Sequence, residues 1–458
     1  MTFSIVSLDT PTLGDRSYLV HDGALAFVVD PQRDIDRVLV LLAEHGVRLA
    51  AVFETHIHND YLTGGLALAR ATGATYHVNG ADYVDFERSP LRDAAVVEIG
   101  DRMRVTALAT PGHTFTHLSY ALTDATTGDA VGVFTGGSLL YGATGRPDLL
   151  GPEHTDTLAR EQHASAHRLA GLLDDATPVF PTHGFGSFCA AGQSEATAST
   201  IGEERRTNPA LTRDREDYVR DLVAGLDAWP AYYARMAPAN AAGPAAPDLS
   251  PPAEVDPAEL RTRLERGEWV VDLRHRTVFA AGHVVGTLNL GLEGSFATNL
   301  GWLLDAGTPL TLLGDSAEDV AEAQRELVRI GVERPAGQAT GKPESWTTEP
   351  LGSYPTATFA DLADVRHHRA VGVLDVRRRL EHSDERIEGA VNIPLHELAD
   401  RVDEVSAGEV WVHCAAGYRA SVAVSLLRAL APYAQRSLVA VDDTFDNARD
   451  TALPILRD

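Results

Sequence analysis

One stretch of the chain repeats itself at a spacing of about one small domain. The segment VVDLRHRTVFAAGHVVGTLNL at residues 270–290 aligns without gaps to VLDVRRRLEHSDERIEGAVNI at residues 373–393, a shift of 103 residues. The matched positions include Asp272, Arg274, Gly286 and Asn289, which correspond to Asp375, Arg377, Gly389 and Asn392. A period of this length indicates a duplicated domain rather than a solenoid of short repeats.

Each copy has the same order of local patterns. A helical stretch (PAELRTRLER or FADLADVRHH) precedes a short apolar strand (WVVDL or VGVLDV) and then a loop. This order predicts a small α/β domain with a parallel sheet. Proline-rich stretches without a helical or strand period, at 243–257 and 341–355, predict linkers. We therefore expect domains at residues 1–242, 252–345 and 352–458.

Charge and composition exclude several classes of partner. The formal charge is −26 and is spread along the chain, which opposes binding to nucleic acid or to anionic lipid. No apolar run approaches the roughly 20 residues that cross a bilayer, and the first residues do not resemble a signal peptide, so we expect a cytoplasmic protein without membrane contact. The chain has two cysteines, Cys189 and Cys414, and no CxxC pair, so neither a disulfide framework nor a zinc knuckle built on cysteines is available.

Within the first 240 residues, histidines recur just after the ends of predicted strands. The string THIHNDY places His56, His58 and Asp60 just after the apolar run AAVFE, TPGHT places His113 in a turn, and PTHGFGS places His183 in another. Short strands alternate with helices throughout this region, which favours two sheets covered by helices. Neutral imidazole is the commonest metal ligand, so these loops predict a metal site.

The same strings resemble a known superfamily. Residues 1–240 resemble metallo-β-lactamases, and ETHIHNDY, TPGHT, FTGGSLLYGATGRPDL and PTHGFGSFC resemble the persulfide dioxygenases in particular. The resemblance implies an αβ/βα sandwich. It also implies one non-haem iron, held by two histidines and an aspartate, that oxidises a thiol persulfide such as glutathione persulfide to sulfite with O₂. The family's two histidines correspond to His56 and His113.

Two positions depart from that pattern. The family's aspartate corresponds to Gly137, and Tyr61 stands where HxHxDH enzymes have a further histidine. A two-metal hydrolase with the usual ligands is therefore not expected. Three imidazoles, His56, His58 and His113, could hold one mononuclear metal, with Fe(II) favoured and Zn(II) as the alternative. The other interpretation is that the metal was lost together with the aspartate.

Further side chains near these motifs have two interpretations each. His58, Asp60 and His183 could bind the metal or orient its ligands by hydrogen bonds, while His117 is expected to be structural. We assign Arg146, Tyr61 and Cys189 to substrate binding. Arg146 could pair with a substrate carboxylate or form a structural ion pair, and Cys189 could receive sulfur or pack as a small apolar side chain.

The last segment contains a cysteine loop. The apolar strand EVWVH runs into CAAGYRAS and then a helical stretch, so that Cys414 opens a loop closed by Arg419. Backbone N–H groups and the helix N-terminus can stabilise a thiolate or persulfide there. Residues 352–458 resemble a rhodanese domain, which implies that Cys414 is the persulfide-forming nucleophile. The middle copy has no cysteine, so we expect a pseudo-rhodanese that serves as a spacer or docking surface.

We therefore expect an α/β chain with an N-terminal metallo-β-lactamase αβ/βα sandwich and two rhodanese-like parallel α/β domains. The leading hypothesis is sulfide detoxification, in which persulfide is oxidised at the metal site and Cys414 transfers sulfur. Its expected partners are a small thiol persulfide, thiosulfate or sulfite, and we also expect a homo-oligomer. The alternatives are a sulfur carrier with a metal-free N-terminal domain and a zinc thioesterase similar to glyoxalase II.

Overall fold

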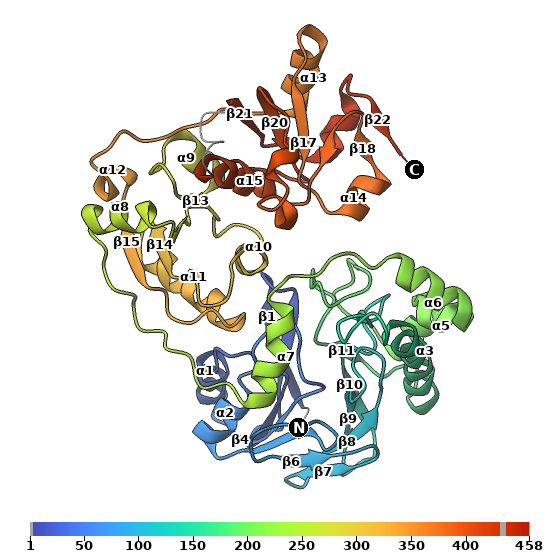
Figure 1. Ribbon diagram of the computed structural model, residues 1–458. Helices are drawn as coiled ribbons and strands as arrows, with labels where there is room; N and C mark the ends of the chain where they lie inside the picture. The colour runs from blue at the N-terminus through green and yellow to red at the C-terminus, as the bar shows by residue number, and fades with distance from the viewer. Residues whose placement is uncertain (1–2, 431–436, 458) are drawn as a thin grey trace. The chain divides into compact units, whose positions relative to one another are not determined.

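The computed structural model describes residues 3–430 and 437–457 (Figure 1). The chain forms two compact units. The first unit comprises residues 1–248 with 327–331, and the second comprises residues 249–326 with 332–458. Both copies of the internal repeat lie in the second unit. Among the described residues, none of the helices has the length and apolar character that a bilayer crossing requires.

Two sheets form the centre of the first unit. One runs β1-β2-β3-β4-β5-β6 and the other β11-β10-β9-β8-β7. The strands of the first are β1 (Ser4–Thr10), β2 (Asp15–His21), β3 (Leu25–Val29), β4 (Arg48–Phe53), β5 (Thr75–Asn79) and β6 (Ser89–Leu91). Those of the second are β7 (Val96–Ile99), β8 (Met103–Ala109), β9 (Leu118–Asp124), β10 (Ala130–Gly136) and β11 (Val179–Pro181).

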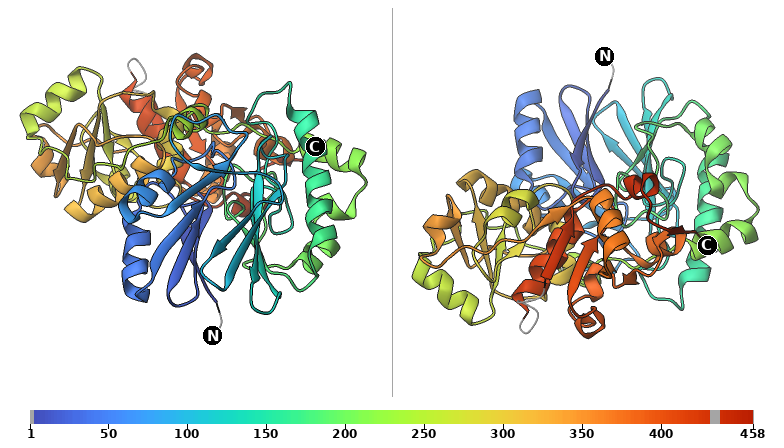
Figure 2. Two further views of the ribbon diagram at one scale, coloured as in Figure 1. Left: turned by 90° about the horizontal axis from the view of Figure 1, so that it is seen from below. Right: turned by 90° about the horizontal axis from the view of Figure 1, so that it is seen from above.

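Alternation along the strands produces a four-layer arrangement. In β2, Tyr18 and Val20 pack with Phe134 of the other sheet, whereas Leu19 packs with residues of α1 (Asp36–His45) and α2 (Gly65–Thr72). On the far side, Val133 packs with α3 (Thr155–Leu172) and α6 (Arg215–Ala224). The order helix, sheet, sheet, helix is visible in Figure 2. This is the expected αβ/βα sandwich.

The second unit contains two parallel sheets, as the repeat predicts. The order β13-β12-β14-β15 joins strands β12 (Trp269–Asp272), β13 (Leu288–Asn289), β14 (Leu310–Gly314) and β15 (Gly337–Thr340). The order β16-β21-β20-β17-β19 joins β16 (Thr356–Ala357), β17 (Gly372–Asp375), β19 (Val391–Asn392), β20 (Glu409–His413) and β21 (Ser437–Val441). A small pair, β18 (Arg386–Ile387) and β22 (Ile455–Leu456), is antiparallel.

The remaining helices cover these sheets and their connections. In the first unit they are α4 (Ile201–Thr207), α5 (Pro209–Thr212) and α7 (Tyr233–Ala242). Beyond it the chain forms α8 (Pro257–Glu265), α9 (Arg276–Ala281), α10 (Phe296–Leu303), α11 (Ala317–Arg329), α12 (Pro343–Trp346), α13 (Phe359–His368), α14 (Arg379–Asp384) and α15 (Tyr418–Ala429).

The sequence repeat is also a repeat of hydrogen bonds. Arg274 donates from Nη2 to Asp272 Oδ2 over 2.6 Å, and Arg377 makes the same bond to Asp375 over 2.7 Å. The side-chain amide of Asn289 donates to the carbonyls of residues 272 and 274, and that of Asn392 donates to those of 375 and 377. The loops after β12 and β17 are therefore fixed by the same three side chains in the two repeats.

Candidate metal centre and sulfur-transfer loop

The predicted histidine loops meet at one edge of the sandwich. His56 and His58 follow β4, His113 follows β8, and His183 follows β11. All four side chains are buried, with at most 1% of their surface exposed. The ring centre of His56 lies 4.8 Å from that of His113 and 5.5 Å from that of His183, and the last two are 5.3 Å apart. The fold thus brings the predicted histidines together.

Hydrogen bonds orient three of these rings through their Nδ1 atoms. Nδ1 of His56 shares a hydrogen bond with the Thr55 hydroxyl over 2.9 Å. Nδ1 of His113 donates to the Arg146 carbonyl over 2.8 Å, and Nδ1 of His183 donates to the Asp15 carboxylate over 2.9 Å. The three Nε2 atoms are buried and have no hydrogen-bond partner in the described part of the chain. Buried nitrogens without a partner are costly, and ring orientation by outer hydrogen bonds is typical of metal ligands. The residues therefore fit a metal ion.

The charges of these rings differ. Burial and the neighbouring histidines lower the pKa of His56, and they lower the pKa of His113 to about 3, so both rings are neutral. Burial also disfavours charge on His183, but the carboxylates of Asp60 and Asp15 raise its pKa to about 10. A cation bound at His183 Nε2 would displace a proton from that ring.

His58 also takes part in a second buried cluster. Its Nε2 lies 3.2 Å from Glu54, 3.3 Å from Asp30 and 3.0 Å from the Tyr61 hydroxyl. Burial opposes charge on the ring, but these two carboxylates raise the pKa of His58 to about 10. Only Nδ1 remains unpartnered among the described residues, with Asp60 at 3.9 Å. The structure thus directs one nitrogen of His58 away from the other imidazoles.

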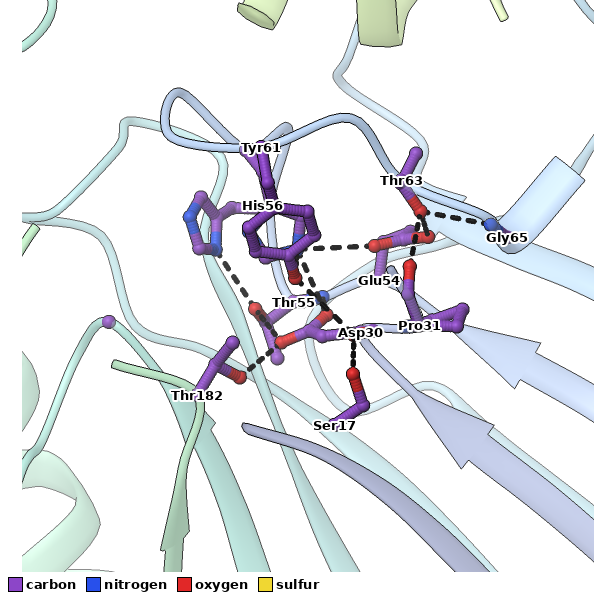
Figure 3. A network of polar contacts seen from close by, with 12 residues as sticks. Ser17, Asp30, Pro31, Glu54, Thr55, His56, Tyr61, Thr63, Gly65 and Thr182 are labelled. Atoms are coloured by element: carbon purple, nitrogen blue, oxygen red, sulfur yellow. Dashed lines mark hydrogen bonds and ion pairs between the residues drawn. The ribbon is translucent and has the colours of Figure 1, made fainter. Parts of the chain in front are cut away.

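Asp30 connects three strand ends close to His56 (Figure 3). It follows β3, and its carboxylate accepts hydrogen bonds from the Thr55 amide and hydroxyl, both at 2.7 Å, and from the Thr182 hydroxyl. The ends of β3, β4 and β11 are therefore held by one side chain. Neither Asp30 nor Glu54 was singled out in the sequence, although both end apolar strands, LAFVVD and AAVFE.

Gly137 lies directly against the site. A Cβ atom on this residue would come within 2.3 Å of Cδ2 of His113. The Gly137 amide donates to Nε2 of His117 over 3.0 Å, which places that histidine in a structural role. Any side chain at position 137 would require His113 to move, so this backbone has no room for the family's aspartate.

Several donor groups are close enough to share an ion. Possible ligand atoms of His56, His58 and His183 lie within 4.8 Å of one another. The same holds for Asp15, Asp60 and His183, and for His113, His183 and Cys189. His183 is common to all three groups. Asp15, which the sequence analysis missed, stands in the run LGDRSYLV without a motif to mark it.

The residues assigned to substrate binding are all buried. Tyr61 and Cys189 have no exposed surface, and burial, followed by the charge of Asp60, raises the pKa of the Cys189 thiol. The guanidinium of Arg146 donates two hydrogen bonds of 2.7 Å to Asp148 and others to backbone carbonyls. This is the geometry of a structural ion pair, and the assignment of these three residues to substrate binding stays a prediction.

The second candidate site is the loop after β20. Cys414 is 2% exposed and starts the loop, and α15 begins at Tyr418. Gly417 has a φ of 86°, and a Cβ atom there would lie 2.2 Å from Asp442 Oδ1. Arg419 donates from both terminal nitrogens to the carboxylate of Glu381, each over 2.7 Å. The loop thus holds the cysteine at a helix N-terminus beside a fixed cation, which suits an anionic sulfur.

The equivalent loop of the middle copy has a different ending. After β14 it contains only Asp315 and Ser316 before α11. The Ser316 amide donates to Asp319 Oδ2 over 2.9 Å, and the Asp319 amide donates to the Ser316 hydroxyl over 3.2 Å. A side-chain carboxylate therefore occupies this helix N-terminus.

Comparisons with known proteins show what each part of the chain is similar to. The Rhodanese-like domain family matches residues 358–442. The chain is 34% identical over 241 residues to Hydroxyacylglutathione hydrolase of Cereibacter sphaeroides, covering 48% of this chain and 91% of that protein. It is 28% identical over 225 residues to the mitochondrial Persulfide dioxygenase ETHE1 of Homo sapiens, covering 46% of this chain and 74% of that protein.

A solved structure extends the likeness. The metallo-β-lactamase from Staphylococcus aureus subsp. aureus COL superposes with a TM-score of 0.67 at 25% identity, covering 75% of this chain and all of that chain. The comparisons confirm the expected fold class, a metallo-β-lactamase fold in the N-terminal part and a rhodanese domain towards the C-terminus.

Proposed function

Since the chain belongs to the metallo-β-lactamase-fold family that includes hydroxyacylglutathione hydrolases and persulfide dioxygenases, and carries a rhodanese domain, we propose that it is an enzyme of sulfane-sulfur metabolism. Its first unit oxidises a thiol persulfide, such as glutathione persulfide, to sulfite with O₂, and its Cys414 transfers sulfur. The observation that carries the proposal is the presence, in one chain, of buried imidazoles with unpartnered nitrogens and of a cysteine loop at a helix N-terminus.

His56, His113 and His183 are the residues that would hold the metal. Fe(II) is favoured, because a redox-active ion supplies the electron chemistry that the reaction of O₂ with a persulfide requires. The chain's contribution is to fix the rings through Thr55, the Arg146 carbonyl and Asp15, and to keep two of them neutral. The overall reaction is RSSH + O₂ + H₂O → RSH + SO₃²⁻ + 2H⁺.

Sulfur transfer uses Cys414. Its thiolate attacks the outer sulfur of a persulfide, the S–S bond breaks, and the thiol RSH leaves after taking up the proton. Sulfite then attacks the outer sulfur of the Cys414 persulfide, which releases thiosulfate and regenerates the thiolate. The amides that precede α15 and the charge of Arg419 stabilise the anionic sulfur in both steps. The sulfite that one site forms is thus a substrate for the other.

The test is O₂ uptake by the full chain. Protein purified without O₂ and loaded with Fe(II) should consume O₂ when glutathione persulfide is added and should form sulfite in equal amount. The metal-free protein is the control and should consume none above the buffer rate. An iron-loaded protein that consumes no O₂ would contradict the dioxygenase proposal, and a chain that never retains stoichiometric metal would favour the sulfur-carrier alternative.

A second candidate rests on the 34% identity to hydroxyacylglutathione hydrolase. In this alternative the same imidazoles hold Zn(II), whose bound water would be the nucleophile for a thioester. Hydrolysis of an S-acylglutathione by zinc-loaded protein, without O₂ uptake by iron-loaded protein, would favour it. Gly137 and Tyr61 stand against it, since they remove two ligands of a two-metal hydrolase.

A further inference from the structure

Cys189 lies close to two of the imidazoles that have an unpartnered nitrogen, those of His113 and His183. Possible ligand atoms of His113, His183 and Cys189 are all within 4.8 Å of one another, and all three side chains are fully buried. The Nδ1 atoms of both histidines are already bound to Arg146 and Asp15, so Nε2 is the nitrogen that each offers. We propose that the thiolate of Cys189 is a ligand of the metal, together with His113 and His183. This inference rests on the proposed metal site and adds a sulfur donor to it.

One backbone segment places the cysteine and the histidine together. The Arg146 amide donates to the Cys189 carbonyl over 2.8 Å, and the Arg146 carbonyl accepts the Nδ1–H of His113 over 2.8 Å. The Cys189 amide in turn donates to the Ser187 hydroxyl over 3.1 Å. Because both partners are bonded to one peptide segment, their relative position does not depend on a flexible side chain. The Arg146–Asp148 ion pair fixes this segment further.

A thiolate from Cys189 supplies the anionic ligand that Gly137 cannot. Proteins bind divalent iron and zinc through anionic as well as neutral ligands, and Gly137 has neither a side chain nor the space for one beside His113. Cys189 reaches the same ring from a different loop, the one that follows His183. On binding, the S–H bond is exchanged for a sulfur–metal bond and the proton passes to solvent. Both Fe(II) and Zn(II) accept thiolate ligands.

The composition of the chain allows a sharp test, because Cys189 and Cys414 are its only cysteines. Full-length metal-free protein is titrated with Co(II) under argon, and bound cobalt is counted by elemental analysis. A thiolate bound to Co(II) gives an intense near-ultraviolet charge-transfer absorption. We expect this absorption, with one cobalt per chain, in the wild type and in the matched control Cys414→Ser, where Cys189 is the only thiol. It should be lost in Cys189→Ser.

The outcomes separate the two proposals. If Cys414→Ser binds one cobalt without the charge-transfer absorption, the metal site stands and Cys189 is not a ligand. If neither protein binds cobalt, the metal site fails and the Cys189 proposal fails with it. A misfolded Cys189→Ser does not affect this decision, because Cys414→Ser alone supports or overturns it. X-ray absorption of zinc-loaded Cys414→Ser is the second measurement, with a sulfur shell at about 2.3 Å expected and its absence contradictory.

Discussion

Arg276 of α9 donates a hydrogen bond from Nε to Oδ1 of Asp442 over 2.6 Å, and so joins the repeat without a cysteine to the repeat that has one. Asp442 packs against Gly417 of the Cys414 loop. The next residue, Tyr418, donates from its hydroxyl to the carbonyl of Gly291 over 2.9 Å. Within the second unit, the middle copy therefore contacts the cysteine loop directly and does more than separate two domains.

We expect Arg276→Ala to lower the sulfurtransferase kcat by roughly tenfold, on the order of 1.4 kcal/mol, since Asp442 loses a charge-assisted hydrogen bond beside the loop. Thiosulfate-to-cyanide transfer measures this. Arg276→Lys should restore part of the rate, and Arg266→Ala, an exposed arginine of the same copy, is the matched control. Equal rates for Arg276→Ala and Arg266→Ala would contradict a supporting role.

Two variants should separate the two activities. Cys414→Ser is expected to abolish thiosulfate-to-thiol sulfur transfer and to leave O₂ uptake largely intact, because it removes the only thiol of the rhodanese loop. His113→Ala should show the reverse, with lower bound metal and preserved sulfur transfer. Each variant is the control for the other, and both assays run on the same preparations. Loss of both activities in a folded Cys414→Ser protein would argue against independent sites.

Gly137→Asp should weaken the site rather than restore the family's ligand. The new Cβ would lie 2.3 Å from His113, and overpacking of this kind costs about 1–3 kcal/mol. We expect a lower Tm and less bound metal. Gly171→Asp is the control, because nothing lies within 4 Å of a Cβ there. A Gly137→Asp protein with unchanged Tm and increased metal content would contradict this prediction, because it would show that His113 moves aside at no cost.

The Glu381–Arg419 ion pair should make the stability of the folded protein depend on pH in the acid range. Burial disfavours the Glu381 carboxylate, but Arg419 overcomes this and lowers its pKa from 4.5 to about 2. The folded-state pKa is depressed, so the stabilisation is complete above the unfolded value near 4.5 and is lost as the pH falls towards 2. Glu381→Gln should reduce the loss of Tm across this window relative to the wild type. Identical acid profiles for the two proteins would contradict the pairing.

The parts of this fold that the sequence predicts are those set by contiguous residues. The duplication follows from Asp272, Arg274 and Asn289 and their counterparts: Arg274 bonds to Asp272 two positions before it, and Asn289 bonds to the same loop from 15 and 17 positions away. The Cys414 loop follows from a strand, a short run and a helix start. Such features are set by residues within one short segment, so they can be predicted from the sequence.

The choice among the histidines could not be predicted in this way. His56 and His58 are two residues apart, yet the carboxylates of Asp30 and Glu54 bind Nε2 of His58, whereas Nε2 of His56 is unpartnered. The ring of His183 is fixed by Asp15, which lies 168 residues away in the chain. Contacts between distant strands decide which nitrogens face the site, and one sequence does not contain such contacts.

The carboxylate at the start of α11 determines whether the middle copy can bind an anion at that helix N-terminus. Two rhodanese-like copies would offer two helix N-termini to an anion, but Asp319 fills one of them from within. Of these two helix N-termini, the one that follows Cys414 is therefore the one left open to an anionic sulfur. Because Cys414 is the one cysteine in the sequence of the rhodanese-like half, saturation with persulfide should load a single atom of sulfur there per chain. The duplication thus gives the unit its framework and leaves its sulfur-carrying capacity unchanged.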